Sequence, residues 1–444
     1  MGAAVNTPAR CAALLVAAPA SGQGKTTVAA ALARLHARAG RKVRAFKVGP
    51  DFLDPCWLEA ATGAPVHALD LWMVGEGGCA AALHAAAADC DLLVIEGAMG
   101  LFDGSPSAAD LAQRFGIPVL AVIDASSMAG TFGALVFGLR HYRADMPWAG
   151  VLANRVASPR HRDMLREGLR EPGDWLGSLP RSADWALPER HLGLVADLPA
   201  SEVMARIDAA ADALSATPLA ALPLERWAVE FPAPDAVDAL PPLLAGRRIA
   251  VAHDASFAFV YRANVDTLEA LGASVAFFSP LAGEALPACD AVWLPGGYPE
   301  LYPQQLAAAT ATRDSLAAHI DAGKPVWAEC GGMMALMDEI CDMEGRSHPG
   351  WGLLPGVTRM HRRLAAIGPQ QLALDAGTLR GHTFHYSTAA SPLPVVARTA
   401  RPDAAAAHDA GEAVYAHEGV RASYFHAWFA SCPGAIAALL GGRT

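Results

Sequence analysis

Short apolar runs that alternate with helical patterns most strongly constrain how this chain can fold. In the first half they lie at residues 12–18, 43–49, 91–97, 117–124 and 149–155. Continuous apolar runs are typical of strands covered on both faces, and their alternation with helices predicts a parallel sheet. The second half repeats the pattern at residues 247–254, 273–280, 290–297 and 324–330. The sequence therefore predicts an α/β protein in which both halves share one general architecture.

A proline-rich stretch separates the two halves. The chain has 444 residues, and a typical domain size of about 150 residues allows two or three domains. The prolines within residues 229–246 would interrupt any helix or strand. We therefore expect an N-terminal domain over residues 1–228, a linker over 229–246 and a C-terminal domain over 247–444.

Composition and charge argue against several classes of protein. The net charge is −10 and no block is rich in Lys and Arg, so we do not expect a nucleic-acid partner. No apolar stretch reaches the roughly 18 residues of a membrane-spanning helix, and the N-terminal residues do not resemble a signal peptide. The eight cysteines are scattered without CxxC pairs, which disfavours a disulfide framework and a structural zinc site. We expect a cytoplasmic protein.

A glycine-rich loop, SGQGKTT, follows the first predicted strand and precedes a predicted helix. Its glycines let backbone amides point at phosphate oxygens, and the helix adds the positive end of its dipole. Lys25 would then reach the β- and γ-phosphates and Thr26 would bind Mg²⁺. Proline replaces the first glycine of the strict P-loop pattern, but the strand and helix around the loop favour nucleotide binding over an ordinary turn. The expected ATP-binding residues are Ser21, Gly22, Gly24, Lys25, Thr26 and Thr27.

Charged residues at the ends of other predicted strands would complete this site. The carboxylate of Glu96 could hold Mg²⁺ directly or through water. Lys47, Asp51 and Asp54 follow another strand, at the sheet edge where open α/β sheets bind ligands. The expected metal ligands are Thr26, Asp51 and Glu96, and the candidates for substrate binding or phosphoryl transfer are Lys47, Asp54 and Asp103.

Turns and strand caps are the competing interpretation for several of these residues. Asp51 and Asp54 lie in good turn sequences, and Asp103 in its DG dipeptide is equally consistent with a turn. Asp124 and Asn154 end two further strands, where capping is as good an interpretation as contact with nucleotide or metal.

Cys330 directly follows an apolar run and precedes two glycines. A nucleophile on a sharp turn between a strand and a helix is presented away from the sheet, and a small residue after it prevents a collision. We expect the N-terminus of the following helix to lower the pKa of the thiol and favour the thiolate. A small buried hydrophobic residue is the alternative, and it is our interpretation of the other seven cysteines.

A thiol nucleophile needs a base, and the candidates in this half are His382, His385 and His426. His426 lies in an apolar and aromatic run, where an ionisable ring is costly unless it is used or its nitrogens are paired. A satisfied core histidine is equally consistent with the sequence. The amides of Gly297 and Tyr298, at a second glycine pair, could bind an oxyanion.

An ordered set of motifs resembles the cobyrinic acid a,c-diamide synthase family, including its hydrogenobyrinic acid version. The motifs are APASGQGKTT, FKVGPDFLDP, VIEGAMGLFDG, LPERHLGLV, FFSPL, LPGGYPELY, ECGG and RGHTFHYS. The resemblance implies an N-terminal P-loop ATP-binding domain and a C-terminal class I-like glutamine amidotransferase domain. By motif, Cys330 matches the nucleophile and His426 its partner histidine, and the oxyanion hole is assigned to Gly297, Tyr298 and Gly331.

The resemblance implies ATP-dependent amidation of the a and c acetate side chains of a corrinoid in cobalamin biosynthesis. Glutamine would acylate Cys330 and release ammonia, while ATP phosphorylates a substrate carboxylate that ammonia then attacks. The implied cofactor is Mg²⁺, the implied partners are ATP, L-glutamine and the corrinoid, and a homodimer is an open expectation. Whether the ring holds cobalt is left open.

The motifs depart from the family's usual pattern at three places. Thr383 stands where the family often has glutamate, Trp428 stands where it usually has histidine, and residues 356–372 lack a usual GY pair. Two other readings compete: a cobyric acid synthase that amidates other carboxylates, and a P-loop switch ATPase. The switch ATPases have no glutaminase half, so Cys330 with His426 argues against them.

Overall fold

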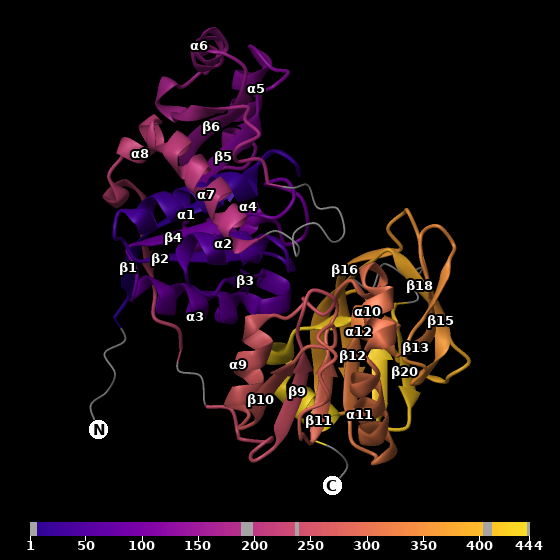
Figure 1. Ribbon diagram of the computed structural model, residues 1–444. Coiled ribbons are helices and arrows are strands. Elements are labelled where there is room, and N and C mark those ends of the chain that lie inside the picture. The colour runs from indigo at the N-terminus through magenta and orange to yellow at the C-terminus, as the bar shows by residue number, and fades with distance from the viewer. Residues whose placement is uncertain (1–6, 188–198, 236–238, 403–410, 442–444) are drawn as a thin grey trace. The chain divides into compact units, whose positions relative to one another are not determined.

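The computed structural model describes residues 7–187, 199–235, 239–402 and 411–441. The LPERHLGLV motif lies almost wholly outside these ranges. The chain divides into two compact units, and in the described ranges the first ends at residue 235 and the second begins at residue 239. Each unit is built around a largely parallel sheet with helices, which confirms the predicted α/β class (Figure 1). None of the described helices is both long enough and apolar enough to cross a membrane.

The N-terminal unit contains one sheet with the strand order β3-β2-β4-β1-β5-β6-β7. Its strands are β1 (Ala9–Ala17), β2 (Val43–Val48), β3 (His67–Leu69), β4 (Leu92–Glu96), β5 (Val119–Asp124), β6 (Trp148–Val156), β7 (Trp175–Pro180) and β8 (Ala228–Phe231). The strands of this order pair in parallel, so their carboxyl ends share one edge. Because β1 pairs with β4 on one side and with β5 on the other, the loop after β1 lies near the centre of the carboxyl edge, where open α/β sheets bind ligands.

Strand β8 corrects the predicted linker of residues 229–246. It pairs antiparallel with the start of β1, where Ala9 lies opposite Phe231. Val229 and Phe231 are buried in the core of the N-terminal unit. The apolar side chains that precede the first proline therefore extend the first sheet, and the linker as predicted begins too early.

The helices of the N-terminal unit follow the predicted alternation. They are α1 (Lys25–Arg38), α2 (Asp54–Thr62), α3 (Glu76–Ala87), α4 (Ala108–Phe115), α5 (Thr131–His141), α6 (Pro159–Glu167), α7 (Ala200–Ser215) and α8 (Pro218–Ala221). Helix α1 begins immediately after the glycine-rich loop and buries its alanine-rich middle. It packs against α7, where Arg34 forms an ion pair of 2.7 Å with Asp208. These contacts fix the helix whose first turn faces the loop.

The C-terminal unit contains a larger sheet with the order β10-β9-β11-β12-β21-β20-β19. Its strands are β9 (Arg248–Ala252), β10 (Ser274–Phe278), β11 (Ala291–Leu294), β12 (Val326–Glu329), β19 (Val395–Arg398), β20 (Ala413–His417) and β21 (Val420–Ser423). Alternate residues of β11 enter two different core clusters, with Val292 and Leu294 in one and Ala291 and Trp293 in the other. The strand is therefore covered on both faces, as its continuous apolar run predicts.

Two smaller sheets complete this unit. One contains β13 (Met337–Cys341), β14 (Ser347–Pro349), β15 (Leu354–Met360) and β18 (Ser387–Ala390), and the other contains β16 (Ala366–Leu374), β17 (Gly377–His385) and β22 (His426–Ala427). The helices are α9 (Arg262–Ala270), α10 (Pro303–Ala308), α11 (Thr310–Asp321), α12 (Gly331–Leu336) and α13 (Pro433–Leu440). The pairing of β17 with β22 sets His382 opposite His426. Two candidate bases thus become neighbours through sheet register.

Candidate active sites

The glycine-rich loop of the N-terminal unit has the backbone geometry that its sequence predicts. Gly22 and Gly24 have φ angles of 78° and 92°, in the region that favours glycine. A Cβ atom at Gly24 would lie 2.2 Å from Nδ2 of Asn154. Lys25 lies at the start of α1, and its ammonium donates to the carbonyls of Ala20 at 3.1 Å and Met99 at 2.6 Å. The lysine therefore bridges the loop and the segment that follows β4.

Gln23, which the sequence analysis did not single out, is the residue by which the neighbouring strands hold the loop. Its side-chain oxygen accepts from the amide of Asp124 at 2.8 Å, and its carbonyl accepts from Nδ2 of Asn154 at 2.9 Å. Asp124 in turn forms an ion pair with Arg155 at 2.5 Å. In this structure Asp124 and Asn154 thus position the loop. Gln23 occupies a variable position of the motif, so no sequence signal marked it.

A buried charge cluster lies beside the first turn of α1. The hydroxyl of Thr26 donates to Oε1 of Glu96 at 2.6 Å. The ammonium of Lys47 lies 3.2 Å from the same oxygen, 2.8 Å from Oδ2 of Asp54 and 3.9 Å from Oδ2 of Asp51. Lys47, Asp54 and Glu96 are all buried. The structure thus brings together one hydroxyl, one cation and three carboxylates that sequence reasoning had placed at the same sheet edge.

The charges in this cluster shift one another's pKa values. Burial alone would lower the pKa of Lys47, but Glu96, Asp54 and Asp51 together raise it, so Lys47 stays charged. Burial raises the pKa of Glu96 to about 7, against the attraction of Lys47. Oxygen Oε2 of Glu96 is buried without a hydrogen-bond partner among the described residues. An unpartnered carboxylate oxygen beside the Thr26 hydroxyl fits a hard cation such as Mg²⁺.

The cluster is not an all-protein metal cage. The described part of the chain contains no group of three or more His, Cys, Asp and Glu side chains arranged to hold a metal ion. Oxygen Oδ1 of Asp51 accepts from the amides of Leu53 at 2.9 Å and Asp54 at 3.0 Å, which fixes the start of α2. Asp103 is exposed and accepts from the amide of Gly100 at 2.8 Å. Asp51 and Asp103 therefore also have the turn roles named as alternatives.

Cys330 lies on a strained turn between β12 and α12. Its φ of 45° and ψ of −108° are unusual for a residue with a side chain. Its amide donates to the carbonyl of Ser423 at 2.7 Å, which ties the turn to β21. A Cβ atom at Gly331 would lie 2.8 Å from both the nitrogen and the oxygen of Gly297, and one at Gly332 would lie 2.3 Å from the oxygen of Leu294. The two glycines after Cys330 are therefore required by close backbone approach.

The expectation of a lowered pKa at Cys330 is wrong for this structure. The side chain is buried, and burial followed by the charge of Glu300 raises the pKa of the thiol above its ordinary value. The amide of Gly331 acts in the opposite direction but contributes less. Helix α12 has only six residues, so its dipole is weak. The surroundings of Cys330 in this structure therefore oppose formation of the thiolate.

His426 lies against the glycine pair that precedes Tyr298. A Cβ atom at Gly296 would lie 2.3 Å from Cε1 of His426, while the neighbouring Gly297 is the residue that approaches Gly331. The turn at Gly296 and Gly297 therefore approaches His426 through Gly296 and the strained turn at Cys330, the cysteine elbow, through Gly297. The ring of His426 stacks on that of His382 with centroids 4.9 Å apart. Burial, followed by the charges of His382 and His385, lowers the pKa of His426 well below its ordinary value, so the imidazole is neutral, as a general base requires.

Of the three amides assigned to the oxyanion hole, that of Tyr298 has another partner. It donates to the carbonyl of Ser256 at 3.0 Å. This bond explains why Gly297 tolerates no side chain, since a Cβ atom there would lie 2.0 Å from the same carbonyl oxygen. The Tyr298 amide therefore holds the turn, whereas Gly297 and Gly331 meet at the elbow.

Glu329, the residue before Cys330, was missed by the sequence analysis. Its Oε1 accepts from the indole of Trp327 at 2.7 Å and from the amide of Ala427 at 3.2 Å. Burial raises the pKa of this carboxyl group to about 8. Glu329 thus ties the strand that precedes Cys330 to the strand that carries His426. An acidic residue at the end of an apolar strand was the available signal.

At position 383, where related sequences often have glutamate, the threonine of this chain contacts the carboxylate of Glu412. The hydroxyl of Thr383 donates to Oε1 of Glu412 at 2.8 Å, and Nε2 of His385 lies 3.0 Å from the same oxygen. The other ring nitrogen of His385 lies 2.7 Å from the carbonyl of Ser387, and the ring stacks on Tyr424 with centroids 3.8 Å apart. Both nitrogens of His385 are therefore engaged, which argues against His385 as the base.

Comparisons with known proteins match both units. Residues 14–195 match the family model described as a CobQ/CobB/MinD/ParA nucleotide binding domain, and residues 248–433 match the CobB/CobQ-like glutamine amidotransferase domain. Hydrogenobyrinate a,c-diamide synthases of Stutzerimonas stutzeri and Pseudomonas aeruginosa are each 55% identical over 98% of this chain, and the matches cover 99% and 98% of those relatives. A cobyrinate a,c-diamide synthase of Herminiimonas arsenicoxydans is 48% identical over 96% of this chain and 95% of its own. With such identity over nearly the whole chain, this protein belongs to the family of hydrogenobyrinate and cobyrinate a,c-diamide synthases.

Proposed function

We propose that this enzyme uses ATP and glutamine to amidate the a and c acetate carboxylates of hydrogenobyrinate in cobalamin biosynthesis. The strained elbow at Cys330 carries the proposal, because a P-loop alone is shared with switch ATPases that lack a glutaminase half. The choice of hydrogenobyrinate rests on the two hydrogenobyrinate a,c-diamide synthases that are 55% identical to this chain. Cobyrinate, named for the relative at 48% identity, is the comparison substrate.

In the glutaminase half, Cys330 attacks the side-chain carboxamide of glutamine. His426 accepts the proton of the thiol and later donates a proton to the departing ammonia. The amides of Gly297 and Gly331 stabilise the negative charge on the tetrahedral intermediate. The Tyr298 amide can join them only if its bond to Ser256 opens. Water then hydrolyses the thioester to glutamate and frees Cys330.

In the ATP-binding half, the loop and the first turn of α1 bind the triphosphate. Amides from Ser21 to Thr27, including those of Gly22 and Gly24, face the phosphates, and Lys25 exchanges its carbonyl partners for phosphate oxygens. Thr26 and Glu96 would hold Mg²⁺, with Asp51 at the edge of that site. Bound there, Mg²⁺ supplies positive charge to the transferring phosphoryl group.

The γ-phosphoryl group of ATP passes to the substrate carboxylate and converts it into an acyl phosphate. Ammonia then attacks the acyl carbon and phosphate leaves. Lys47 holds Asp54 and Glu96 in place for this step, and Asp54 and Asp103 are candidates for substrate contact. A carboxylate alone is a poor electrophile, and this explains why one chain combines both activities.

The setting of the reaction is also part of the proposal. All eight cysteines are free thiols, which suits the reducing cytoplasm where ATP is available. Self-association into a homodimer stays a prediction, which light scattering on the purified protein would test.

The test compares nitrogen donors and substrates in wild type and in Cys330→Ala. With glutamine, wild type should form ADP and diamide only when a corrinoid is present, and hydrogenobyrinate should be the better substrate. Cys330→Ala should lose glutamine-driven amidation and keep ammonia-driven amidation. Cys341→Ala, which removes another buried thiol, is the matched control and should keep both. ATP turnover that no corrinoid affects, or a Cys330→Ala protein that still uses glutamine, would reject the proposal.

A further inference from the structure

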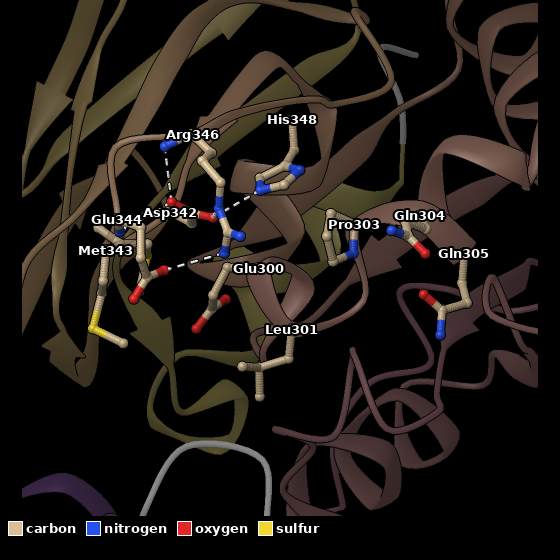
Figure 2. Close-up of a pocket in the computed structure, with 11 residues that line it drawn as sticks. Glu300, Leu301, Pro303, Gln304, Gln305, Asp342, Met343, Glu344, Arg346 and His348 are labelled. Atoms are coloured by element: carbon tan, nitrogen blue, oxygen red, sulfur yellow. Dashed lines mark hydrogen bonds and ion pairs between the residues drawn. The ribbon is translucent and has the colours of Figure 1, made fainter.

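The C-terminal unit contains a cavity of about 470 Å³ that neither the nucleophile nor the candidate base lines. Its walls come from the turn after the second glycine pair, from α10 and from the β13–β14 hairpin. Figure 2 shows the side chains that line it, which are mainly charged and amide groups. They are Glu300, Leu301, Pro303, Gln304, Gln305, Asp342, Met343, Glu344, Arg346, His348 and Met360.

Two of the three acidic side chains in this cavity already have cationic partners. Asp342 lies 2.7 Å from the guanidinium of Arg346 and 2.9 Å from Nε2 of His348. Glu344 lies 3.3 Å from the same guanidinium. The single guanidinium of Arg346 is thus shared by both carboxylates, and dashed lines in Figure 2 mark its contact with Glu344 and the contact of His348 with Asp342.

Glu300 has no such partner. Within the described ranges it forms no ion pair, and its Oε2 is buried without a hydrogen bond. Burial raises the pKa of this carboxyl group to about 7. A buried carboxylate is costly unless it is paired or hydrogen-bonded. The cavity is therefore complementary to a ligand that brings one positive charge to Glu300.

The same side chain is close to the nucleophile. Glu300 lies in the short helical turn Pro299–Leu301, which begins two residues after Gly297. A Cβ atom at Gly331 would lie 2.8 Å from the nitrogen of Gly297 and 2.9 Å from Cδ of Pro299, so this segment packs against the cysteine elbow. After burial, the charge of Glu300 is the largest contribution that raises the pKa of Cys330.

We propose that the Glu300 carboxylate binds the α-ammonium group of the glutamine whose carboxamide reacts with Cys330. This inference rests on the proposed glutaminase function of that cysteine. The α-ammonium is the only cationic group of glutamine, and its pairing with Glu300 gives this carboxylate the cationic partner that it lacks among the described residues. The same pairing cancels the negative charge that opposes thiolate formation. Amide donors without an α-amino group therefore bind less well and also activate Cys330 less.

The experiment compares glutamine with glutaramate, the same amide acid without the α-amino group, in wild type and in Glu300→Gln. The readout is the kcat/KM of glutaminase turnover with each donor. Wild type should prefer glutamine by about 10- to 100-fold, the range of one charged hydrogen bond. In Glu300→Gln this preference should fall to near unity, and kcat/KM for glutaramate should not fall, because the variant also removes the negative charge that raises the pKa of Cys330. Glu344→Gln, which changes a paired carboxylate in the same cavity, is the matched control and should keep the full preference.

A preference for glutamine that survives in Glu300→Gln would overturn the inference, and so would a wild type that does not discriminate between the donors. An equal loss with both donors would assign Glu300 a structural role instead. Ammonia-driven amidation reports whether the variant is folded. If Glu300→Gln fails that check, Glu300→Ala takes its place, and an unchanged preference there overturns the inference. A wild type that hydrolyses neither donor would instead reject the proposed function itself.

Discussion

Replacing Lys47 by methionine should destabilise the N-terminal unit more strongly than any exposed lysine replacement. Methionine keeps most of the side-chain length but removes the cation between Asp54 and Glu96. Both carboxylates are buried and lie within 3.2 Å of the ammonium. Breaking a buried ion pair from one side typically costs about 3–5 kcal/mol, because the remaining charge has no compensation.

Proton uptake limits this cost and gives it a characteristic pH dependence. The pKa of Glu96 is already about 7 with Lys47 present, and loss of the cation raises it further. The folded variant then binds more protons than its unfolded chain, so its stability falls as pH rises. Each pH unit over which one extra proton is bound changes the free energy of unfolding by about 1.4 kcal/mol. The deficit relative to wild type should therefore be smallest at and below pH 7, where Glu96 is protonated in both folded proteins, and should grow above pH 7 toward about 3–5 kcal/mol.

Hydrogen exchange of the amides in β2 and β4 measures this deficit for the N-terminal unit alone. Lys42→Met is the control, since its ion pair with Asp89 at 3.0 Å joins side chains that are 72% and 63% exposed. That exposed pair should be worth less than about 1 kcal/mol at any pH. A Lys47→Met protein that matches Lys42→Met, or whose deficit shrinks as pH rises, would refute the reasoning.

Three further predictions concern the two sites. Gly331→Ala places a Cβ atom 2.8 Å from Gly297, so glutamine-driven amidation should fall by about 100-fold while ammonia-driven amidation persists. Gly434→Ala, whose Cβ atom would meet no atom within 4 Å, is the control and should change neither rate. Thr26→Ala should lower amidation with either nitrogen donor and raise the Mg²⁺ concentration needed for half-maximal rate, whereas an unchanged Mg²⁺ requirement would count against Thr26 as a ligand. Alkylation of Cys330 by iodoacetamide, followed by mass spectrometry without glutamine, should be slow at pH 7 and accelerate up to pH 9 because the thiol's pKa is raised; a rate that is flat across this range would mean a thiolate.

The sequence was most informative about strands that are covered on both faces. The runs that end at Glu96, Asp124 and Cys330 were placed to within a few residues, because burial on both sides leaves a continuous apolar signal. The short strands after Leu336 were not foreseen. The helix predicted after Cys330 ends at Leu336, and β13 begins at the next residue. The helix is buried, and so are Met337, Ile340 and Cys341 of the strand. Periodicity alone cannot distinguish two short buried segments of this kind.

The sites show the same contrast between local and distant information. Residues at strand ends could be grouped from the sequence because parallel strands bring their carboxyl ends to one edge. The contacts of Glu329 with Ala427, of Gln23 with Asn154 and of Thr383 with Glu412 join residues that are 98, 131 and 29 positions apart. Such pairs depend on sheet order and register, which no local pattern encodes.

Cysteine chemistry was also only partly predictable. The sequence predicts that the seven cysteines other than Cys330 are small buried hydrophobic residues, but Cys56 is exposed. The sulfur atoms of Cys11 and Cys90 lie 3.5 Å apart, a contact that scattered spacing does not reveal.

The protonated state of Cys330 also bears on how the enzyme survives in a cell. Peroxide oxidises thiolates far faster than thiols, and exposed thiols faster than buried ones. Cys330, the proposed nucleophile, is 4% exposed and its pKa is raised, so it should be protected from sulfenic acid formation while the enzyme is idle. The same surroundings that raise the pKa of Cys330 would thus keep the thiol unoxidised and able to react in the next turnover.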